Sequence, residues 1–597
     1  MAVKPDMLCV LWSIGLVSML TLCSGTPTPI TVQSKAGNIM GFQENVVVDG
    51  QQKTITKFLG IPFAESTAGV NKFKKPVPKA KFTGTFDART ESNTCYQGSE
   101  PMEKAIEGSY GLKTTYSDDC LKLNIYIPGS VSTITPKPVM IWMYGGGFIQ
   151  GSTLLYQPDG LVSYGDVIVI TVNYRLGMFG FLRDSQGHFP GNQGLWDQQL
   201  AIQWVNDNIE SFNGIKDNIT IFGQSAGSAS VLFQAMYPGN RGLFKRVIAQ
   251  SGTPFSFWAI ANESTSDQFI KDEGCVSTDV VTCLQSKDSE TFVNNNTYAF
   301  GPVIDNDFLI STPSEIINGN SSKSQMAREF FLSVDIVVGV NNQEGFSAFV
   351  YFWKPKNALN DTSNNFTISH SLFKDQVVPN VANVSLPPLV SERTKAIVEE
   401  LLYFTYTNWQ NPMNAAALKS NGIALYDDAY MNAGTIKSIA GHAALGSGRT
   451  YLYELGFQTL YHLSGMSGLR GWTHGDDIPF VFGFPLLEWP NVFGKKQNFT
   501  TTEIQISKSM ITLWTNFAKS GDPNLPTTTS VRWPEYTPSS QEFLTTNSSW
   551  FMVGQYFHPQ RMSLWNDIIP SVIQQSVNQQ THVECTTKTP IDEILVG

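Results

Sequence analysis

Short, almost wholly apolar segments with the composition of β-strands recur along this chain, and they restrict its fold more than any other feature. They lie at 139–144, 166–174, 219–222, 246–250, 335–340 and 450–455. Segments of this length without a polar face suit strands that are buried on both sides. Helical patterns lie between them, notably at 195–209 and 225–236. The predicted fold class is therefore α/β, with a large, mostly parallel central sheet covered by helices on both faces.

The composition is that of a folded protein with a large core. The 597 residues are 42% hydrophobic and 15% charged, and no internal repeat, low-complexity block or linker interrupts them. We expect residues 26–575 to form a single domain and residues 576–597 to form a polar C-terminal tail. A net charge of -10 repels phosphate backbones and anionic lipids, which disfavours nucleic acids and acidic membranes as partners.

The first 25 residues differ from the rest of the chain. Lys4 precedes an apolar run that ends at Cys23, and two small residues follow. This pattern predicts a secretory signal peptide over residues 1–25. A retained membrane anchor is the alternative, but the run is short for a span, and no other stretch approaches the roughly 18 apolar residues that a span needs. We expect a protein that is secreted or held in the lumen of the secretory pathway, without a membrane anchor.

Cysteine usage agrees with export. Removal of the signal peptide leaves Cys95, Cys120, Cys275, Cys283 and Cys585. The first four form neighbouring pairs, which suggests one bridge within each pair. Cys585 is left over, either as a free thiol or as an intermolecular link that would make a homodimer.

Asn-x-Ser/Thr sequons also agree with a secreted, glycosylated protein. One of the nine sequons, at Asn218, opens an apolar strand and is expected to be buried and unmodified. The glycosylation candidates are Asn262, Asn295, Asn320, Asn360, Asn365, Asn383, Asn498 and Asn547.

The segment NITIFGQSAGSAS indicates a nucleophile. A short strand runs into Gly223-Gln224-Ser225-Ala226-Gly227, and a helix of small residues follows. In such an elbow the serine sits on a sharp turn, and the flanking glycines let backbone pass where a Cβ would clash. The pattern alone is weak, but the strand before it and the helix after it are the required context. Ser225 is the predicted nucleophile.

A run of glycines lies upstream in VMIWMYGGGFIQGS, directly after an apolar strand. Acyl transfer passes through a tetrahedral oxyanion, and each hydrogen-bond donor aimed at it contributes about 2.7–4 kcal/mol. We assign the amides of Gly146, Gly147 and Ala226 to this oxyanion hole. The alternative is a flexible or phosphate-binding loop, but the loop lacks the Lys and Ser/Thr of a P-loop.

In these motifs the chain resembles the type-B carboxylesterase/lipase family, which includes carboxylesterases, cholinesterases and bile-salt-activated lipases. The resemblance extends from about Gly41 to Trp565 and includes FLGIPFAESTAGVNKFKKPVP, SDDCLKLNIYIP, VNYRLGMFGFL, GVNNQEG and HGDDIPFVFG. It implies an α/β-hydrolase fold, a Ser-Glu-His triad, and bridges that join Cys95 to Cys120 and Cys275 to Cys283. Neither a cofactor nor a metal is expected, since no Cys/His cluster has ligand spacing.

The other two triad members follow the serine in the chain. Glu344 comes soon after the strand at 335–340, and His474 lies in RGWTHGDD. The order Ser, acid, His is that of α/β-hydrolases, and each residue follows the C-terminal end of a strand. His474 is expected to take the proton from Ser225 and return it to the leaving alcohol, while Glu344 fixes the imidazole tautomer.

Two departures from the family motif bear on the substrate. Gln224 stands where the family usually carries Glu, and Tyr110 stands where cholinesterases resemble one another in a Trp. A carboxylate and an aromatic face together hold quaternary ammonium groups. Asp477 would supply a charge instead, but a hydrogen-bonding role is the preferred interpretation. We therefore expect neutral esters as substrates.

Aromatic residues line the expected substrate pocket. In segments that resemble the acyl-pocket segments of the family, Trp258, Tyr298 and Phe300 would favour short acyl groups. The alternative is that they belong to the core. The full set of predicted pocket residues is Tyr110, Phe148, Gln224, Trp258, Tyr298 and Phe300.

The sequence therefore predicts a secreted serine carboxylic-ester hydrolase that acts through an acyl-enzyme on Ser225. A hydrolase of choline esters is one alternative. A non-catalytic adhesion protein on the same fold is the other, because fold alone does not establish activity.

Overall fold

A computed structural model of the chain describes residues 27–98, 114–276, 279–293, 298–354, 366–387, 390–462, 471–488, 491–492, 495–546 and 549–576. The described strands are β1 (Thr28–Ser34), β2 (Gly37–Val48), β3 (Gln51–Pro62), β4 (Thr85–Asp87), β5 (Lys122–Pro128), β6 (Lys137–Met143), β7 (Ile168–Val172), β8 (Gly214–Gln224), β9 (Arg246–Gln250), β10 (Asp335–Asn341), β11 (Thr450–Leu455), β12 (Asn491–Val492), β13 (Lys495–Lys496), β14 (Glu542–Thr546) and β15 (Phe551–Gln555).

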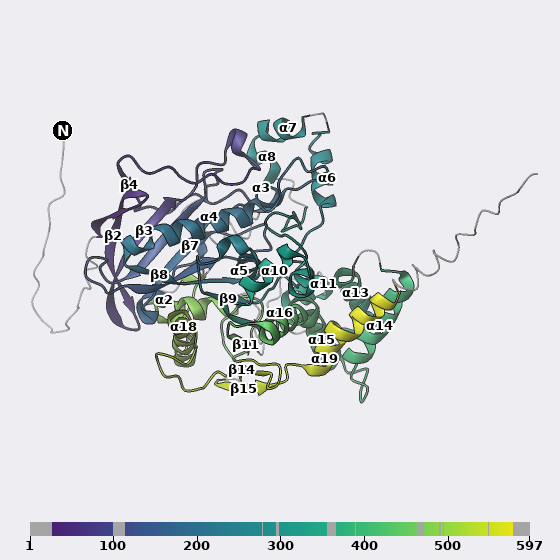
Figure 1. Ribbon diagram of the computed structural model, residues 1–597. Helices are drawn as coiled ribbons and strands as arrows, with labels where there is room; N and C mark the ends of the chain where they lie inside the picture. Colours follow the sequence, from purple (N-terminus) through teal and green to yellow (C-terminus); the bar gives the residue numbers. More distant parts are fainter. Residues whose placement is uncertain are drawn as a thin grey trace, which may run out of the picture.

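Helices connect and surround these strands (Figure 1). They are α2 (Asp159–Gly165), α3 (Gly177–Phe181), α4 (Gln193–Asn208), α5 (Ala226–Met236), α6 (Ser264–Asp272), α7 (Val280–Ser286), α8 (Ser289–Val293), α9 (Pro313–Asn318), α10 (Ser322–Phe331), α11 (Phe346–Trp353), α12 (His370–Leu372), α13 (Val378–Ser385), α14 (Glu392–Tyr406), α15 (Ala415–Asp427), α16 (Ala433–Leu445), α17 (Ile478–Phe482), α18 (Thr501–Ser520) and α19 (Pro559–Ser563).

One 13-stranded sheet runs through the molecule in the order β1-β2-β3-β5-β7-β6-β8-β9-β10-β11-β14-β15, with β4 beside β2. Its centre, from β7 to β14, pairs in parallel, which confirms the expected α/β fold. The N-terminal strands β1, β2, β3 and β5 and the last strand β15 pair antiparallel, so the whole sheet is mixed.

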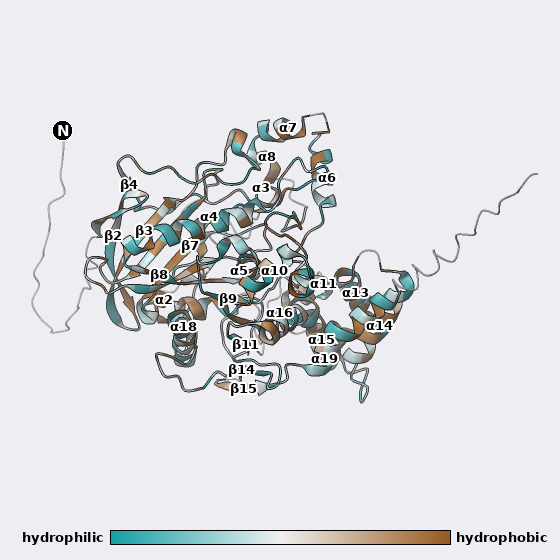
Figure 2. Ribbon diagram, in the orientation of Figure 1, coloured by the Kyte–Doolittle hydropathy of each residue, from teal (hydrophilic) through white to brown (hydrophobic). Residues whose placement is uncertain are grey.

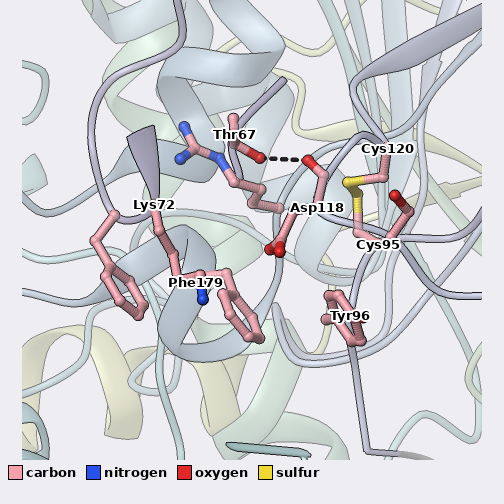
Figure 3. Close-up of a pocket in the computed structure, with 10 residues that line it drawn as sticks. Thr67, Lys72, Cys95, Tyr96, Asp118, Cys120 and Phe179 are labelled. Atoms are coloured by element: carbon pink, nitrogen blue, oxygen red, sulfur yellow. Dashed lines mark hydrogen bonds between the residues drawn. A yellow bond between two sulfur atoms is a disulfide. The ribbon is translucent and has the colours of Figure 1, made fainter. Parts of the chain in front are cut away.

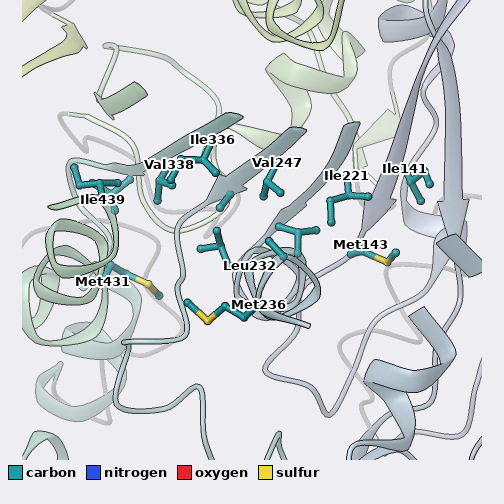
Figure 4. Close-up of a cluster of buried hydrophobic side chains, with 14 of the residues drawn as sticks. Ile141, Met143, Ile221, Leu232, Met236, Val247, Ile336, Val338, Met431 and Ile439 are labelled. Atoms are coloured by element: carbon teal, nitrogen blue, oxygen red, sulfur yellow. The ribbon is translucent and has the colours of Figure 1, made fainter. Parts of the chain in front are cut away.

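The two faces of the sheet carry separate cores, because successive side chains of a strand point in opposite directions. On β6, Ile141 and Met143 belong to the core on the α5 side, whereas Met140 and Trp142 belong to the core that contains residues of α18. Figure 4 shows Leu232 and Met236 of α5 lying under the strands that carry Ile221 and Val247. Figure 2 shows the brown apolar colour concentrated on the central strands. Helices thus cover both faces, as predicted.

Both predicted disulfides are present. Cys95 is joined to Cys120, and Cys275 is joined to Cys283. The first bridge borders a small cavity of about 10 Å³, where the Thr67 hydroxyl donates to the Asp118 carbonyl over 2.6 Å (Figure 3). That volume corresponds to about one water molecule, so the cavity is too small for an organic ligand.

Several sequence predictions lie outside the described residues. These are the signal peptide at 1–25, the tail with Cys585, Tyr110, and the sequons at Asn295, Asn360, Asn365 and Asn547. Within the described part of the chain, no helix has both the length and the apolar composition that a membrane crossing requires.

The prediction for Asn218 can be compared with the structure directly. The Asn218 side chain is partly buried, its Nδ2 donates to the Lys519 carbonyl over 3.2 Å, and its Oδ1 accepts from Arg246. Both amide atoms are thus engaged inside the fold.

The junction of β6 and α5 generates the first testable prediction. A Cβ added at Gly227 would lie 2.0 Å from the Met143 carbonyl oxygen, so that Gly227→Ala forces the start of α5 away from the sheet. We expect a loss of about 3 kcal/mol in the free energy of unfolding, measured by denaturant titration.

Gly84→Ala is the matched control, because a Cβ at Gly84 meets nothing within 4 Å. Its stability is expected to stay within about 0.5 kcal/mol of wild type. Equal stabilities of the two variants would contradict the packing described.

Candidate active site

Ser225 stands at the turn between β8 and α5, and its backbone has a conformation that residues other than glycine rarely adopt. Its φ is 60° and its ψ is -125°. The Ser225 amide donates to the Gln250 carbonyl over 2.8 Å, and the Ser225 carbonyl accepts from Ala229 over 3.0 Å. The surrounding hydrogen bonds therefore maintain a strained residue, which is typical of functional positions.

The elbow glycines are explained by close backbone approach. A Cβ at Gly223 would lie 2.4 Å from the carbonyl oxygen of Gly227. Together with the contact between Gly227 and Met143, this shows why the elbow excludes larger residues on either side of Ser225.

Glu344 and His474 are brought together although they lie 130 residues apart. His474 Nδ1 and Glu344 Oε2 are 2.6 Å apart. The carboxylate is fully buried, and its other oxygen accepts from the Ser251 hydroxyl over 2.5 Å and from the Asn341 amide over 2.6 Å. With both oxygens engaged, Glu344 holds the imidazole in one orientation.

The second imidazole nitrogen faces the residue before the nucleophile. His474 Nε2 lies 3.2 Å from Gln224 Nε2. Because Glu344 accepts the proton on Nδ1, the Nε2 of the neutral ring carries a lone pair to which the Gln224 amide donates. Among the described residues, Gln224 rather than Ser225 is the side-chain partner of Nε2. Catalytic hydrogen bonds are often incomplete without substrate.

Carboxylates around the histidine set its protonation. Burial alone lowers the pKa of His474, but the charge and hydrogen bond of Glu344, with smaller contributions from Asp477 and Asp476, raise the pKa above its usual value. Asp477 is itself buried, which raises its pKa to about 6. It accepts from Gln250 over 2.5 Å and from Asn341 over 3.1 Å.

The glycine loop lies directly against the nucleophile. A Cβ on Gly145 would lie 2.8 Å from the Ser225 Cβ and 2.5 Å from the Gln224 carbonyl oxygen. Gly146 and Gly147 follow with φ of +115° and +63°, in a region that favours glycine. This loop and the first turn of α5, which includes Ala226, are thus the backbone segments next to Ser225.

Trp258, one of the predicted pocket aromatics, lies near Ser225. A Cβ on Gly252 would touch both the Ser225 carbonyl oxygen, at 2.6 Å, and Trp258 Cη2, at 3.0 Å. The Trp258 ring is 6.4 Å from that of Phe148, and its Nε1 donates to the Tyr430 carbonyl over 2.9 Å. Trp258 is therefore fixed at both ends beside Ser225.

Tyr298 and Phe300 have other surroundings. Both rings pack against Phe269 of α6, at 5.7 and 5.4 Å between centroids. The Tyr298 hydroxyl donates to Asp272 at the surface. Their contacts are those of a core cluster, which was the alternative interpretation of these residues.

Sequence reasoning missed the residues that support the triad. Ser251 and Asn341 bind Glu344, Gln250 binds Asp477, and the Asp427 carboxylate accepts from the Gly345 amide over 2.6 Å. Ser251 and Gln250 stand at the C-terminal end of β9, the strand between β8 and β10. The sequence signal that could have identified these two residues is their polar character at the C-terminal end of a buried strand. No set of three His, Cys, Asp or Glu side chains suited to a metal occurs in the described part of the chain.

The fold and the comparisons with known proteins agree. The architecture is that of an α/β-hydrolase. A model of the carboxylesterase family matches residues 28–565. A cholinesterase of Mus musculus is 31% identical to this chain in an alignment that covers 94% of this chain and 91% of the relative. The chain belongs to the carboxylesterase family, and it is a serine hydrolase of carboxylic esters.

The raised pKa of His474 predicts the pH dependence of hydrolysis. A general base must be unprotonated, so kcat/KM should rise with pH through a midpoint above histidine's ordinary value of about 6.5. Asp477→Asn removes a charge that favours the imidazolium, which lowers the pKa of His474 and moves the midpoint to lower pH. The measurement is a pH profile of kcat/KM on a neutral ester.

Glu454→Gln serves as the control, because Glu454 pairs with His558 rather than with the triad. An Asp477→Asn midpoint that coincided with those of wild type and the control would refute the electrostatic role of Asp477.

Proposed function

We propose that the protein is a secreted serine esterase that hydrolyses neutral carboxylic esters through an acyl-enzyme on Ser225. The observation that carries the proposal is the 2.6 Å contact between the buried Glu344 and His474, next to a serine strained on its elbow. In the first step His474 Nε2 takes the Ser225 proton while Oγ attacks the ester carbonyl carbon.

The negative charge then develops on the former carbonyl oxygen. The amides of Gly146, Gly147 and Ala226 are assigned to this oxyanion, and the N-terminus of α5 adds a partial positive charge. Collapse of the tetrahedral intermediate breaks the bond to the alcohol, which leaves with the proton from His474. Water attacks the acyl-enzyme with His474 again as base, and the acid product and free Ser225 are released.

Neutral esters are favoured because Gln224 brings an uncharged amide to the place where a carboxylate would attract a cation. The alternative, a hydrolase of choline esters, is supported by the 31% identity to a cholinesterase. Whatever the identity to that relative, residue 224 of this chain is an uncharged glutamine. A binding role without catalysis is disfavoured by the complete set of Ser225, Glu344, His474 and the glycine loop.

Secretion is supported by sequence features and by covalent structure. The first 25 residues have the pattern of a signal peptide. The two disulfides suit an oxidising compartment. A homodimer linked through Cys585 is a further part of the proposal, testable by non-reducing electrophoresis.

A panel of p-nitrophenyl esters tests the mechanism and the acyl preference together. We expect Ser225→Ala to lose at least about 10³-fold in kcat, because the nucleophile is absent. In wild type the acetate should be preferred to long-chain esters, since the bulky Trp258 ring lies near Ser225. Full activity of the alanine variant would exclude the acyl-enzyme, and a preference for long chains would exclude the restricted pocket.

Gln224→Glu tests the basis of substrate choice. The carboxylate should raise kcat/KM for acetylthiocholine relative to a neutral thioacetate about tenfold, because it attracts the quaternary ammonium. Gln224→Met, uncharged and similar in length, is the matched control and should leave the ratio near the wild-type value. An unchanged ratio in the glutamate variant would show that residue 224 does not select the substrate charge.

A further inference from the structure

An open groove of about 860 Å³ lies away from the catalytic residues. One wall is the segment that follows β9, including Phe257 and Ile260, and the other is the end of α13 with Leu386. Ser225, Glu344 and His474 do not line it. Its volume is within the range of about 300–1,000 Å³ that is usual for small-molecule clefts.

The groove is lined by apolar residues together with a few polar ones. Phe257, Ile260, Val303, Ile304 and Leu386 contribute its apolar surface. Glu263, which also lines it, is engaged, because Arg183 Nε donates to its carboxylate over 2.8 Å. The Phe257 ring is fixed edge-to-face on Tyr430 at 4.8 Å between centroids. A ligand here would meet apolar faces, an open side in contact with water, and a carboxylate that is already paired with Arg183.

Two glycosylation sequons lie on opposite walls of this same groove. Asn262 begins Asn-Glu-Ser before α6, and Asn383 begins Asn-Val-Ser at the end of α13. Both side chains line the groove and both residues are exposed. Asn262 Oδ1 accepts from the Ser264 amide over 3.0 Å, and Asn383 Oδ1 accepts from Lys395 over 3.1 Å. Within the described residues, neither Nδ2 has a hydrogen-bond partner.

Other described sequons differ from this pair. The Nδ2 of Asn218 donates to Lys519 inside the fold. Asn320 and Asn498 are exposed but are not among the residues that line the groove. Only at Asn262 and Asn383, within the described part of the chain, do available amide nitrogens and an apolar cleft coincide.

We propose that Asn262 and Asn383 both carry N-linked oligosaccharides and that these sugars cover the groove. The inference rests on the proposed secretion, which supplies the diphosphate-lipid-linked oligosaccharide donor. At each site Nδ2 loses a proton and bonds to C1 of the first sugar, while the bond from C1 to the lipid diphosphate breaks. The apolar C–H faces of the sugars contact Phe257 and Leu386, and their hydroxyls remain hydrated on the open side.

Covering the groove has a physical advantage for a protein in solution. Contiguous exposed apolar surface favours association with other molecules. Attached sugars are bulky and hydrated. Oligosaccharides attached to both walls would therefore shield the groove without adding a charge or approaching Ser225.

The test uses the full chain expressed through a eukaryotic secretory pathway. Peptide mass spectrometry before and after enzymatic deglycosylation should find sugar on both Asn262 and Asn383. The double variant Ser264→Ala/Ser385→Ala removes both sequons and should bind severalfold more of the apolar dye ANS than wild type. Hydrolysis of p-nitrophenyl acetate should be unchanged, which shows that the variant is folded.

Two controls separate the groove from general effects. Ser264→Thr/Ser385→Thr keeps both sequons and should behave as wild type. Ser322→Ala removes the sequon at Asn320, outside the groove, and should leave dye binding unchanged.

Each contrary result has a distinct meaning. Absence of sugar at Asn262 or Asn383 while Asn320 is modified would overturn this proposal alone. Absence of sugar at every sequon would overturn it together with secretion, while ester hydrolysis is measured independently. Equal dye binding by the double alanine variant and wild type would show that the sugars do not cover the groove.

Discussion

The close approach of the Met143 carbonyl to Gly227 is the contact on which the rest of the site depends. It joins the end of β6 to the first turn of α5 at a distance that leaves no room for a side chain. Because α5 begins so close to the sheet, Ser225 must turn within one residue, and it does so with a φ of 60°. The same junction places the glycine loop after β6 against the Ser225 Cβ. Strain at the nucleophile and closeness of the loop therefore have one origin.

The sequence predicts the six central strands from β7 to β11 well, because their apolar runs are buried on both faces, whereas the partly buried β14 was not predicted. The bounds expected for β9 and β11 agree with the structure residue for residue, and α5 begins one residue after its expected start. The N-terminal antiparallel strands were not predicted, since their polar residues break the apolar runs. β3, for example, starts with four exposed residues, from Gln51 to Thr54.

The candidate site is likewise predicted only in part from the sequence. Ser225, Glu344 and His474 are found from motifs and chain order, because each follows a strand of the parallel centre. Their support by Ser251 and Asn341 depends on which strands become neighbours in the folded sheet, and this information is not local. The same holds for Gln224, whose contact with His474 joins residues that are 250 positions apart. The Gln224 side chain, recognised in the sequence as the loss of a carboxylate, is thus also a partner of His474 in the folded structure.

The order of the central strands has a consequence for when the enzyme becomes active. Ser225, Glu344 and His474 follow β8, β10 and β11, and the last of these pairs with β10 in parallel. Pairings of this kind close long loops and form late. A nascent chain that has emerged only as far as α5 contains Ser225 but neither Glu344 nor His474. The three predicted triad residues can therefore meet only after the chain has been synthesised beyond His474.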